Sequence, residues 1–179
     1  MANLLTAIRL LLVIPVAWSF ADESLLPGWL LLLLILLAIA TDYFDGKVAR
    51  ATNTASAKGQ LFDHGTDFLF VTTGLAGCAL AGVTNPYLPA LIVIAFSQYV
   101  LDSHYLFHQK DLRMSILGRW NGIFYFAPLL IIACARLGLG QDVSDVLETA
   151  ASVIAWLLLV STILSIFDRT IAPLRTSET

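Results

Sequence analysis

An uncharged apolar run, Pro27 to Thr41, constrains this sequence more than any other feature. With its flanks, the run reaches the roughly 20 apolar residues that a helix needs to cross a bilayer. The composition of the chain agrees, because 58% of its residues are hydrophobic and only 13% are charged. These values lie outside the range of ordinary soluble domains. We therefore expect a protein that is surrounded largely by lipid.

Five further apolar runs of similar quality occur along the chain. We predict an all-α fold, an integral membrane bundle of six transmembrane helices that forms a single domain over residues 1–179. The predicted spans are 5–22, 27–46, 64–84, 87–107, 116–136 and 148–167. We interpret the first run as a permanent helix and not as a cleaved signal peptide, because Arg9 interrupts it and no small-residue cleavage site follows. Cys78 and Cys134 lie inside apolar runs, so no disulfide framework is indicated.

The basic residues fall mostly on one side of this six-span arrangement. Of the ten lysine and arginine residues, Arg136 alone falls on the side that holds no terminus. Because positive residues are enriched on the cytoplasmic side, we expect both termini in the cytoplasm and a multi-pass protein of the inner membrane. The turn residues Pro27-Gly28, Asn85-Pro86 and 137–140 fall in the predicted outer loops, where they belong.

Four regularly spaced aspartates flank the loop between the second and third spans. Asp42 and Asp45 end one span, and Asp63 and Asp67 begin the next. Because helix positions three or four apart share a face, two neighbouring helices can direct all four carboxylates at one point. Each buried carboxylate without a compensating charge would lower the stability of the fold by several kcal/mol. The four carboxylates therefore need positive charge beside them.

Two bound divalent cations would balance the four negative charges of this cluster. Hard carboxylate oxygens suit Mg²⁺ or Mn²⁺ and give no reason to expect zinc. A pair of such ions could clamp the attacking and leaving oxygens of a phosphoryl displacement. We therefore expect two divalent cations and an active site that faces the cytoplasm.

Three small residues, Gly46, Ala49 and Gly59, share helical faces with the aspartates. Their lack of bulk would let a flat ligand lie directly against the backbone. Close packing of membrane helices explains these residues equally well when they are considered alone. Because these small residues stand beside four carboxylates, we favour the interpretation that a ligand lies against them.

The complete pattern from Asp42 to Asp67, D-x2-D-G-x2-A-R-x8-G-x3-D-x3-D, resembles the signature of the CDP-alcohol phosphatidyltransferases. Every signature position is filled, including Arg50. The resemblance implies a phospholipid-synthesising enzyme with six transmembrane helices that works as a homodimer. It also implies that an acceptor hydroxyl attacks the β-phosphorus of a CDP-linked donor and that CMP leaves.

The same resemblance implies a role for each residue of the signature. Metal binding falls to Asp42, Asp45, Asp63 and Asp67, and Asp67 is also the general base that deprotonates the acceptor. The cytidine and diphosphate would lie along Gly46, Ala49 and Gly59, with Arg50 supporting the phosphate or the aspartates.

The N-terminal stretch Asn3-Leu-Leu-Thr6-Ala-Ile-Arg9 looks like the opening of the bacterial glycerophosphate-transferring and cardiolipin-forming branches. On this basis we add Asn3 and Thr6 to the candidate CDP-binding residues. A polar helix edge that faces lipid head groups explains this stretch as well.

The signals for the acceptor conflict. Members that use glycerol 3-phosphate commonly have proline after the third aspartate and lysine after the fourth, where this chain has His64 and Phe68. The run 62–67 looks more like the choline and ethanolamine phosphotransferases, in which CDP carries the head group and diacylglycerol is the acceptor. We favour CDP-diacylglycerol with a small polar alcohol such as glycerol 3-phosphate, on the N-terminal stretch and the length of the chain. The choline-type reaction is the alternative.

Further ionisable residues on the predicted cytoplasmic side are candidates for binding the acceptor or a phosphate. They are Lys58, His64, Asp102, His104 and Arg119. Ionisable residues at a membrane are functional candidates, but anchoring at the interface explains them as well. A zinc site at His104 and His108 is disfavoured, because no suitable third ligand beyond Asp102 stands nearby.

Two other classes of protein compete with the enzyme. An ion-binding membrane transporter would place acidic residues deep in several spans, whereas here they gather on two adjacent helices. A catalytically silent membrane protein would not depend on Asp67. The expected partners are a CDP-linked lipid or alcohol donor, an alcohol acceptor, membrane lipid and a second copy of the chain, with no nucleic acid.

Overall fold

The computed structural model describes residues 2–51, 57–101 and 116–176, and these form seven helices and no strand. In chain order the helices are α1 (Ala2–Ala21), α2 (Gly28–Ala51), α3 (Ala57–Leu80), α4 (Tyr87–Leu101), α5 (Ile116–Phe124), α6 (Phe126–Ala135) and α7 (Gln141–Thr176). The all-α prediction is confirmed for the described residues.

Helices α5 and α6 together occupy the fifth predicted span. Only Tyr125 separates them, and its backbone N–H still donates to the Asn121 carbonyl oxygen at 2.9 Å. The Tyr125 backbone also keeps helical angles, with φ −61° and ψ −22°. The described part of the chain therefore forms six rods, and the fifth has a short irregularity at Tyr125.

Within the described residues, three segments are long and apolar enough to cross a membrane: Gly28–Lys47, Ile116–Ala135 and Gln141–Ile171. The shorter apolar helices Leu5–Ala21 and Tyr87–Leu101 match two more of the predicted spans. Helix α3 belongs to neither group, because lysine, histidine and two aspartates occupy its first half. A membrane-embedded helical protein is supported, and the number of crossings stays a prediction.

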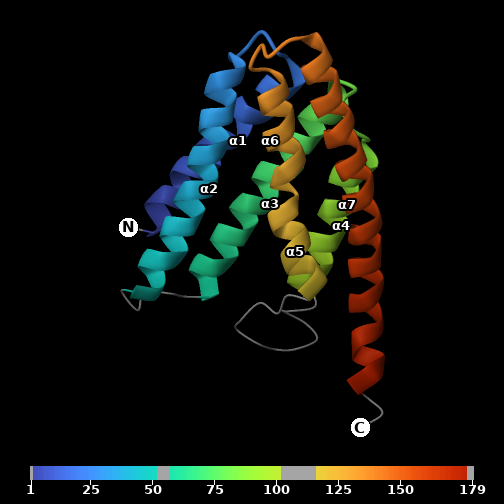
Figure 1. Cartoon of the computed structure of the whole chain (residues 1–179). Helices are drawn as coiled ribbons and strands as arrows, with labels where there is room; N and C mark the ends of the chain where they lie inside the picture. Colours follow the sequence, from blue (N-terminus) through green and yellow to red (C-terminus); the bar gives the residue numbers. More distant parts are fainter. Residues whose placement is uncertain (1, 52–56, 102–115, 177–179) are drawn as a thin grey trace.

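The rods run in alternating directions, and three connections gather at one end of the bundle (Figure 1). They comprise residues 22–27, 81–86 and 136–140, and we name this the loop end. Glycines at positive φ, Gly82 at 77° and Gly138 at 75°, allow two of these tight turns. The last turns of α2 and α7 lie at the opposite end, which we name the site end (Figure 1).

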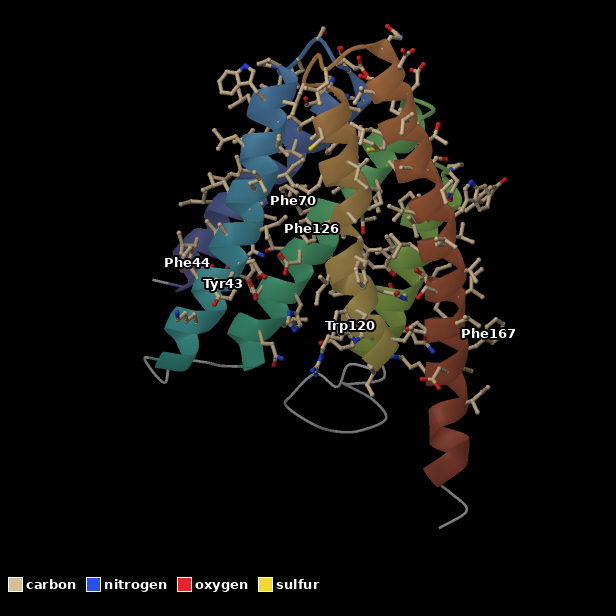
Figure 2. The ribbon with its side chains drawn as sticks, viewed as in Figure 1. Tyr43, Phe44, Phe70, Trp120, Phe126 and Phe167 are labelled. Carbon is tan, nitrogen blue, oxygen red and sulfur yellow. The ribbon has the colours of Figure 1, made fainter. Side chains whose placement is uncertain are left out.

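The bundle buries a continuous apolar core and exposes a second apolar surface outward. Helix α1 packs on α3 and α2, α6 packs on α7, and α2 and α3 both contact α6. Figure 2 shows Phe70 of α3 beside Phe126 of α6 in this core, with ring centroids 5.9 Å apart. Many large apolar side chains point outward, such as Leu11, 76% exposed, and Ile14, 71% exposed. An apolar exterior of this extent suits lipid and not water.

Arg136, the one basic residue that the sequence places at the loop end, ties α6 to α1. Its Nη2 donates to the Phe20 carbonyl oxygen at 3.0 Å, and its Nε lies 3.2 Å from Glu23 Oε1. Carbonyls in the last turn of a helix lack partners within the helix, so Arg136 satisfies a group that would otherwise be orphaned. This contact holds the last turn of α1 against the end of α6.

Candidate active site

Helices α1, α2 and α3 meet at one cluster of charged side chains near the site end. The Arg9 guanidinium lies at its centre, 3.0 Å from Asp42 Oδ1, 3.9 Å from Asp45 Oδ2 and 2.9 Å from Asp63 Oδ1. It also forms an ion pair with Asp67. The structure therefore brings all four aspartates of the sequence pattern to one point. We name Arg9 and these aspartates the aspartate cluster.

The helical faces explain why the four carboxylates meet. Asp42 and Asp45 are three positions apart on α2, and Asp63 and Asp67 are four apart on α3, so each pair shares a face. Tyr43 and Phe44 lie between the first pair and are exposed (Figure 2). Each pair of aspartates therefore points inward, toward α1.

Arg9 is the residue of this cluster that sequence reasoning missed. Its side chain is fully buried, although a cation inside a membrane helix is costly unless it is paired. A signal for this role was present, since Arg9 interrupts an apolar run three positions after Thr6, on the same helical face. A lone charge in such a run is expected to face an acidic partner inside the bundle.

Thr6 supports the cluster from the same face of α1. Its buried hydroxyl donates to Asp45 Oδ2 at 3.1 Å. This bond and the ion pair to Arg9 both hold the same Asp45 oxygen. Thr6 therefore lies at the site, where it contacts an aspartate.

The cluster holds more acidic groups than basic ones. Four ionised carboxylates against one guanidinium leave three formal negative charges uncompensated. Within the described part of the chain, Asp45 Oδ1 is buried and has no hydrogen-bond partner. Both features fit a hard cation that accepts oxygen ligands. Ligand atoms of Asp63, His64 and Asp67 also lie within 4.8 Å of one another and could hold a metal ion.

A cavity of about 520 Å³ borders the cluster, and residues of α2 to α7 line it. Asp42, His64 and Asp67 line one wall, and most other lining residues are apolar or aromatic. Asp45 and Asp63 do not line it. The side of the cluster that carries Asp67 therefore faces a space that can hold a second molecule.

The remaining candidate residues divide into three groups. Gly46 on α2 and Gly59 in the first turn of α3 are half-buried near the site end. Arg119 is exposed and lines the cavity. Asp102 and His104 lie outside the described residues, as do the side chains of Asn3, Ala49, Arg50 and Lys58.

Comparisons with known proteins agree with the sequence pattern. The family model of the CDP-alcohol phosphatidyltransferases matches residues 1–167. The chain is 40% identical over 91 residues to cholinephosphotransferase 1 of Danio rerio, covering 45% of this chain and 24% of that protein. It is 28% identical over 134 residues to a CMP-forming cardiolipin synthase of Streptomyces coelicolor, covering 72% of this chain and 58% of that protein.

The chain spans about a quarter of the first of these relatives and just over half of the second. No solved structure is significantly similar to the chain.

Proposed function

Because the chain belongs to the CDP-alcohol phosphatidyltransferase family, we propose that it is a membrane transferase of phospholipid synthesis. It moves a phospho-alcohol group from a CDP-linked donor to an alcohol acceptor and releases CMP. The observation that carries this proposal is the convergence of four aspartates on one point beside a cavity.

We assign the divalent cations to Asp42, Asp45, Asp63 and Asp67, as two ions of Mg²⁺ or Mn²⁺. The excess negative charge of the cluster and the unpartnered Asp45 oxygen support this assignment. When bound, such ions supply positive charge that stabilises the phosphate oxygens in the transition state. His64 is a further candidate, because its ring lies within ligand distance of Asp63 and Asp67.

Asp67 acts as the general base. It lines the cavity, so an acceptor hydroxyl bound there can reach its carboxylate. The hydroxyl oxygen bonds to the β-phosphorus while its proton passes to Asp67. The bond from the β-phosphorus to the bridging oxygen of the diphosphate breaks, and CMP leaves with the electron pair.

The nucleotide binds along α2 and α3 on the other side of the cluster. Gly46 and Gly59 lie there without side chains that would block a flat ligand, and Ala49, Arg50 and Asn3 complete the proposed CDP site. Thr6 belongs to this site through its hydrogen bond to Asp45.

In the membrane, the six rods cross the bilayer as a single domain, with both termini and the site end in the cytoplasm. The alternating rods and the single arginine at the loop end support this orientation. Two copies of the chain form the working dimer.

The acceptor separates two versions of the reaction. CDP-diacylglycerol with a small polar alcohol such as glycerol 3-phosphate is the version expected from the sequence. A choline-type reaction on diacylglycerol is the alternative, and one relative is a cholinephosphotransferase. An ion-binding transporter is disfavoured, because the acidic residues of the site gather on neighbouring turns of α2 and α3.

CMP release tests the proposal. Purified protein with Mg²⁺ or Mn²⁺ should release CMP from CDP-diacylglycerol or a CDP-alcohol when acceptors are supplied. We expect Asp67→Asn to lower the rate by roughly 10²–10⁴-fold, the usual contribution of a general base. Asp142→Asn, a matched change at the opposite end of the bundle, should leave the rate unchanged. Absence of CMP release across all donors and acceptors would refute the proposal.

A further inference from the structure

The cavity beside Asp67 has a gradient of polarity along the bundle. Arg119 and Arg169 line it near the site end, and Leu130 and Ile92 line it deeper toward the loop end. Leu130 stands eleven residues after Arg119 along α5 and α6, which is roughly 16 Å at about 1.5 Å per helical residue. One end of the cavity is therefore charged, with two arginines beside Asp42 and Asp67, and the other end is apolar.

The wall next to the base is aromatic. Phe68 follows Asp67 on α3 and stacks on Phe96 of α4, with ring centroids 4.1 Å apart and ring planes within 8°. Tyr99 and Tyr125 line the same space. A small hydrophilic alcohol would leave these rings against trapped water, whereas an alcohol with acyl chains would cover them. The volume of about 520 Å³ falls within the roughly 300–1,000 Å³ of pockets for drug-sized ligands, which is room for the polar part of a lipid and the start of its chains.

Besides the carboxylates of Asp42 and Asp67, the polar groups of the wall include several donors. The Arg169 guanidinium lies 5.1 Å above the Tyr99 ring, which holds it at the cavity. Asn121 is 4% exposed, and its Oδ1 accepts a hydrogen bond from Ser161 at 2.6 Å. Among the residues that the structure describes, its Nδ2 has no hydrogen-bond partner. Two guanidiniums and the amide N–H groups of Asn121 match the oxygens of a phosphate ester.

We propose that this cavity is the acceptor site and that the acceptor is a phospholipid alcohol, a lipid that carries a free hydroxyl and an anionic phosphodiester. Its hydroxyl lies at Asp67, its phosphodiester at Arg119 and Arg169, and its chains along the apolar end. This inference rests on the proposed transferase function. It departs from the small polar acceptor expected from the sequence, and it follows from the apolar wall.

The cavity holds the acceptor and not the lipid part of the donor. The reason is that only some of the aspartates line the cavity. Asp67, the proposed base, lines it, whereas Asp45, Gly46 and Gly59 of the proposed nucleotide side do not. A molecule in this cavity therefore presents its hydroxyl to the base, from the side opposite to the nucleotide.

The test compares three acceptors with the full chain in mixed micelles with Mg²⁺. Phosphatidylglycerol, diacylglycerol and glycerol 3-phosphate are each supplied with CDP-diacylglycerol and, separately, with CDP-choline, and CMP and the product lipid are measured. We expect phosphatidylglycerol to support CMP release at least tenfold faster than either of the others. Faster release with glycerol 3-phosphate or diacylglycerol would overturn the inference and leave the transferase function standing. No release with any pair would overturn both.

Variants of Arg119 distinguish a loss of phosphodiester binding from a general loss of structure. Arg119→Glu should raise KM for phosphatidylglycerol at least tenfold with little change in KM for the donor, and Arg119→Lys should recover part of the loss. Lys47→Glu makes the same charge change at an exposed residue outside the cavity, and it should keep the KM for phosphatidylglycerol within twofold. Equal effects of the Arg119→Glu and Lys47→Glu changes on this KM would contradict the proposed site.

Discussion

At the scale of single residues, Arg9 and the aspartates depend on one another. The guanidinium is fully buried in a helix that is otherwise apolar, and its charge is tolerated because four carboxylates surround it. The carboxylates in turn would repel each other without a cation among them. Arg9 therefore holds α1 against α2 and α3 at the point where the proposed chemistry occurs.

Replacing Arg9 with glutamine should destabilise the protein strongly. The change leaves buried carboxylates without their cation, which costs about 3–5 kcal/mol of unfolding free energy. Unfolding in detergent with a chelator present measures this loss, and added Mn²⁺ should restore part of it. Lys47→Gln, at an exposed position, should change the unfolding free energy by less than about 0.5 kcal/mol. A loss below about 1 kcal/mol for Arg9→Gln would show that the cluster does not depend on this ion pairing.

The sequence predicted the aspartates of this cluster but not its arginine. Spacings of three and four placed each aspartate pair on one helical face, and the structure brings the pairs together. Arg9 lies 33 residues from Asp42 in the chain and 58 from Asp67, and local periodicity says nothing about which distant helix a face will meet. The pairing of Thr6 with Asp45 was hidden for the same reason.

At the scale of helices, the position of the cluster depends on how closely α1 approaches α3. A Cβ added at Gly77 would collide with the Ala17 carbonyl oxygen and the Phe20 side chain. Glycine therefore permits backbone contact between the two helices near the loop end. This contact sets the angle at which α1 carries Arg9 toward Asp63 and Asp67.

Gly77→Ala should separate these helices and weaken the fold. We expect a loss of about 1–3 kcal/mol in unfolding free energy, as for other overpacked sites, together with slower CMP release. Gly65→Ala is the matched control on the same helix, because a Cβ there meets nothing within 4 Å. This control should be neutral or slightly stabilising, by up to about 1 kcal/mol, since alanine favours the helix. Equal effects of the two changes would rule out the close approach as their cause.

At this scale, the sequence predicted that the helices exist but did not predict where they end. Apolar runs mark the part of a helix that prefers lipid, so the last span was predicted as 148–167, whereas α7 covers Gln141–Thr176. Its extra turns contain polar residues that hydrophobicity cannot distinguish from loop. The interruption at Tyr125 has a local cause, since Pro128 has no N–H to donate to the Phe124 carbonyl oxygen four residues back.

At the scale of the whole molecule, the charged groups of the proposed site gather toward one end of the bundle. The aspartate cluster and the two cavity arginines lie toward the site end, whereas the loop end has tight turns and Arg136. Between them, outward apolar side chains such as Leu11 and Leu157 form the lipid-facing surface. In the proposed reaction, this arrangement lets a water-soluble nucleotide and a lipid meet at one membrane surface.

Labelling of single cysteines tests the proposed orientation. Cysteine introduced at Asp142, near the loop end, should react with a membrane-impermeant maleimide added outside intact cells. Cysteine at Lys47, near the site end, should react only after the membrane is opened. The native Cys78 is buried and Cys134 half-buried, so the unmodified protein provides the background. The reverse pattern of labelling would place the site on the outer side of the membrane.

The central claim is that four converging carboxylates hold paired cations against a diphosphate. The most direct test is to count the Mn²⁺ ions that bind to the purified protein with CDP present. Titration calorimetry should give two ions per chain for the natural protein. Asp45→Asn should remove one ion or weaken its binding at least tenfold, because Asp45 Oδ1 is the buried oxygen without a partner. No Mn²⁺ binding by the natural protein, or unchanged binding after each aspartate is replaced in turn, would contradict the account.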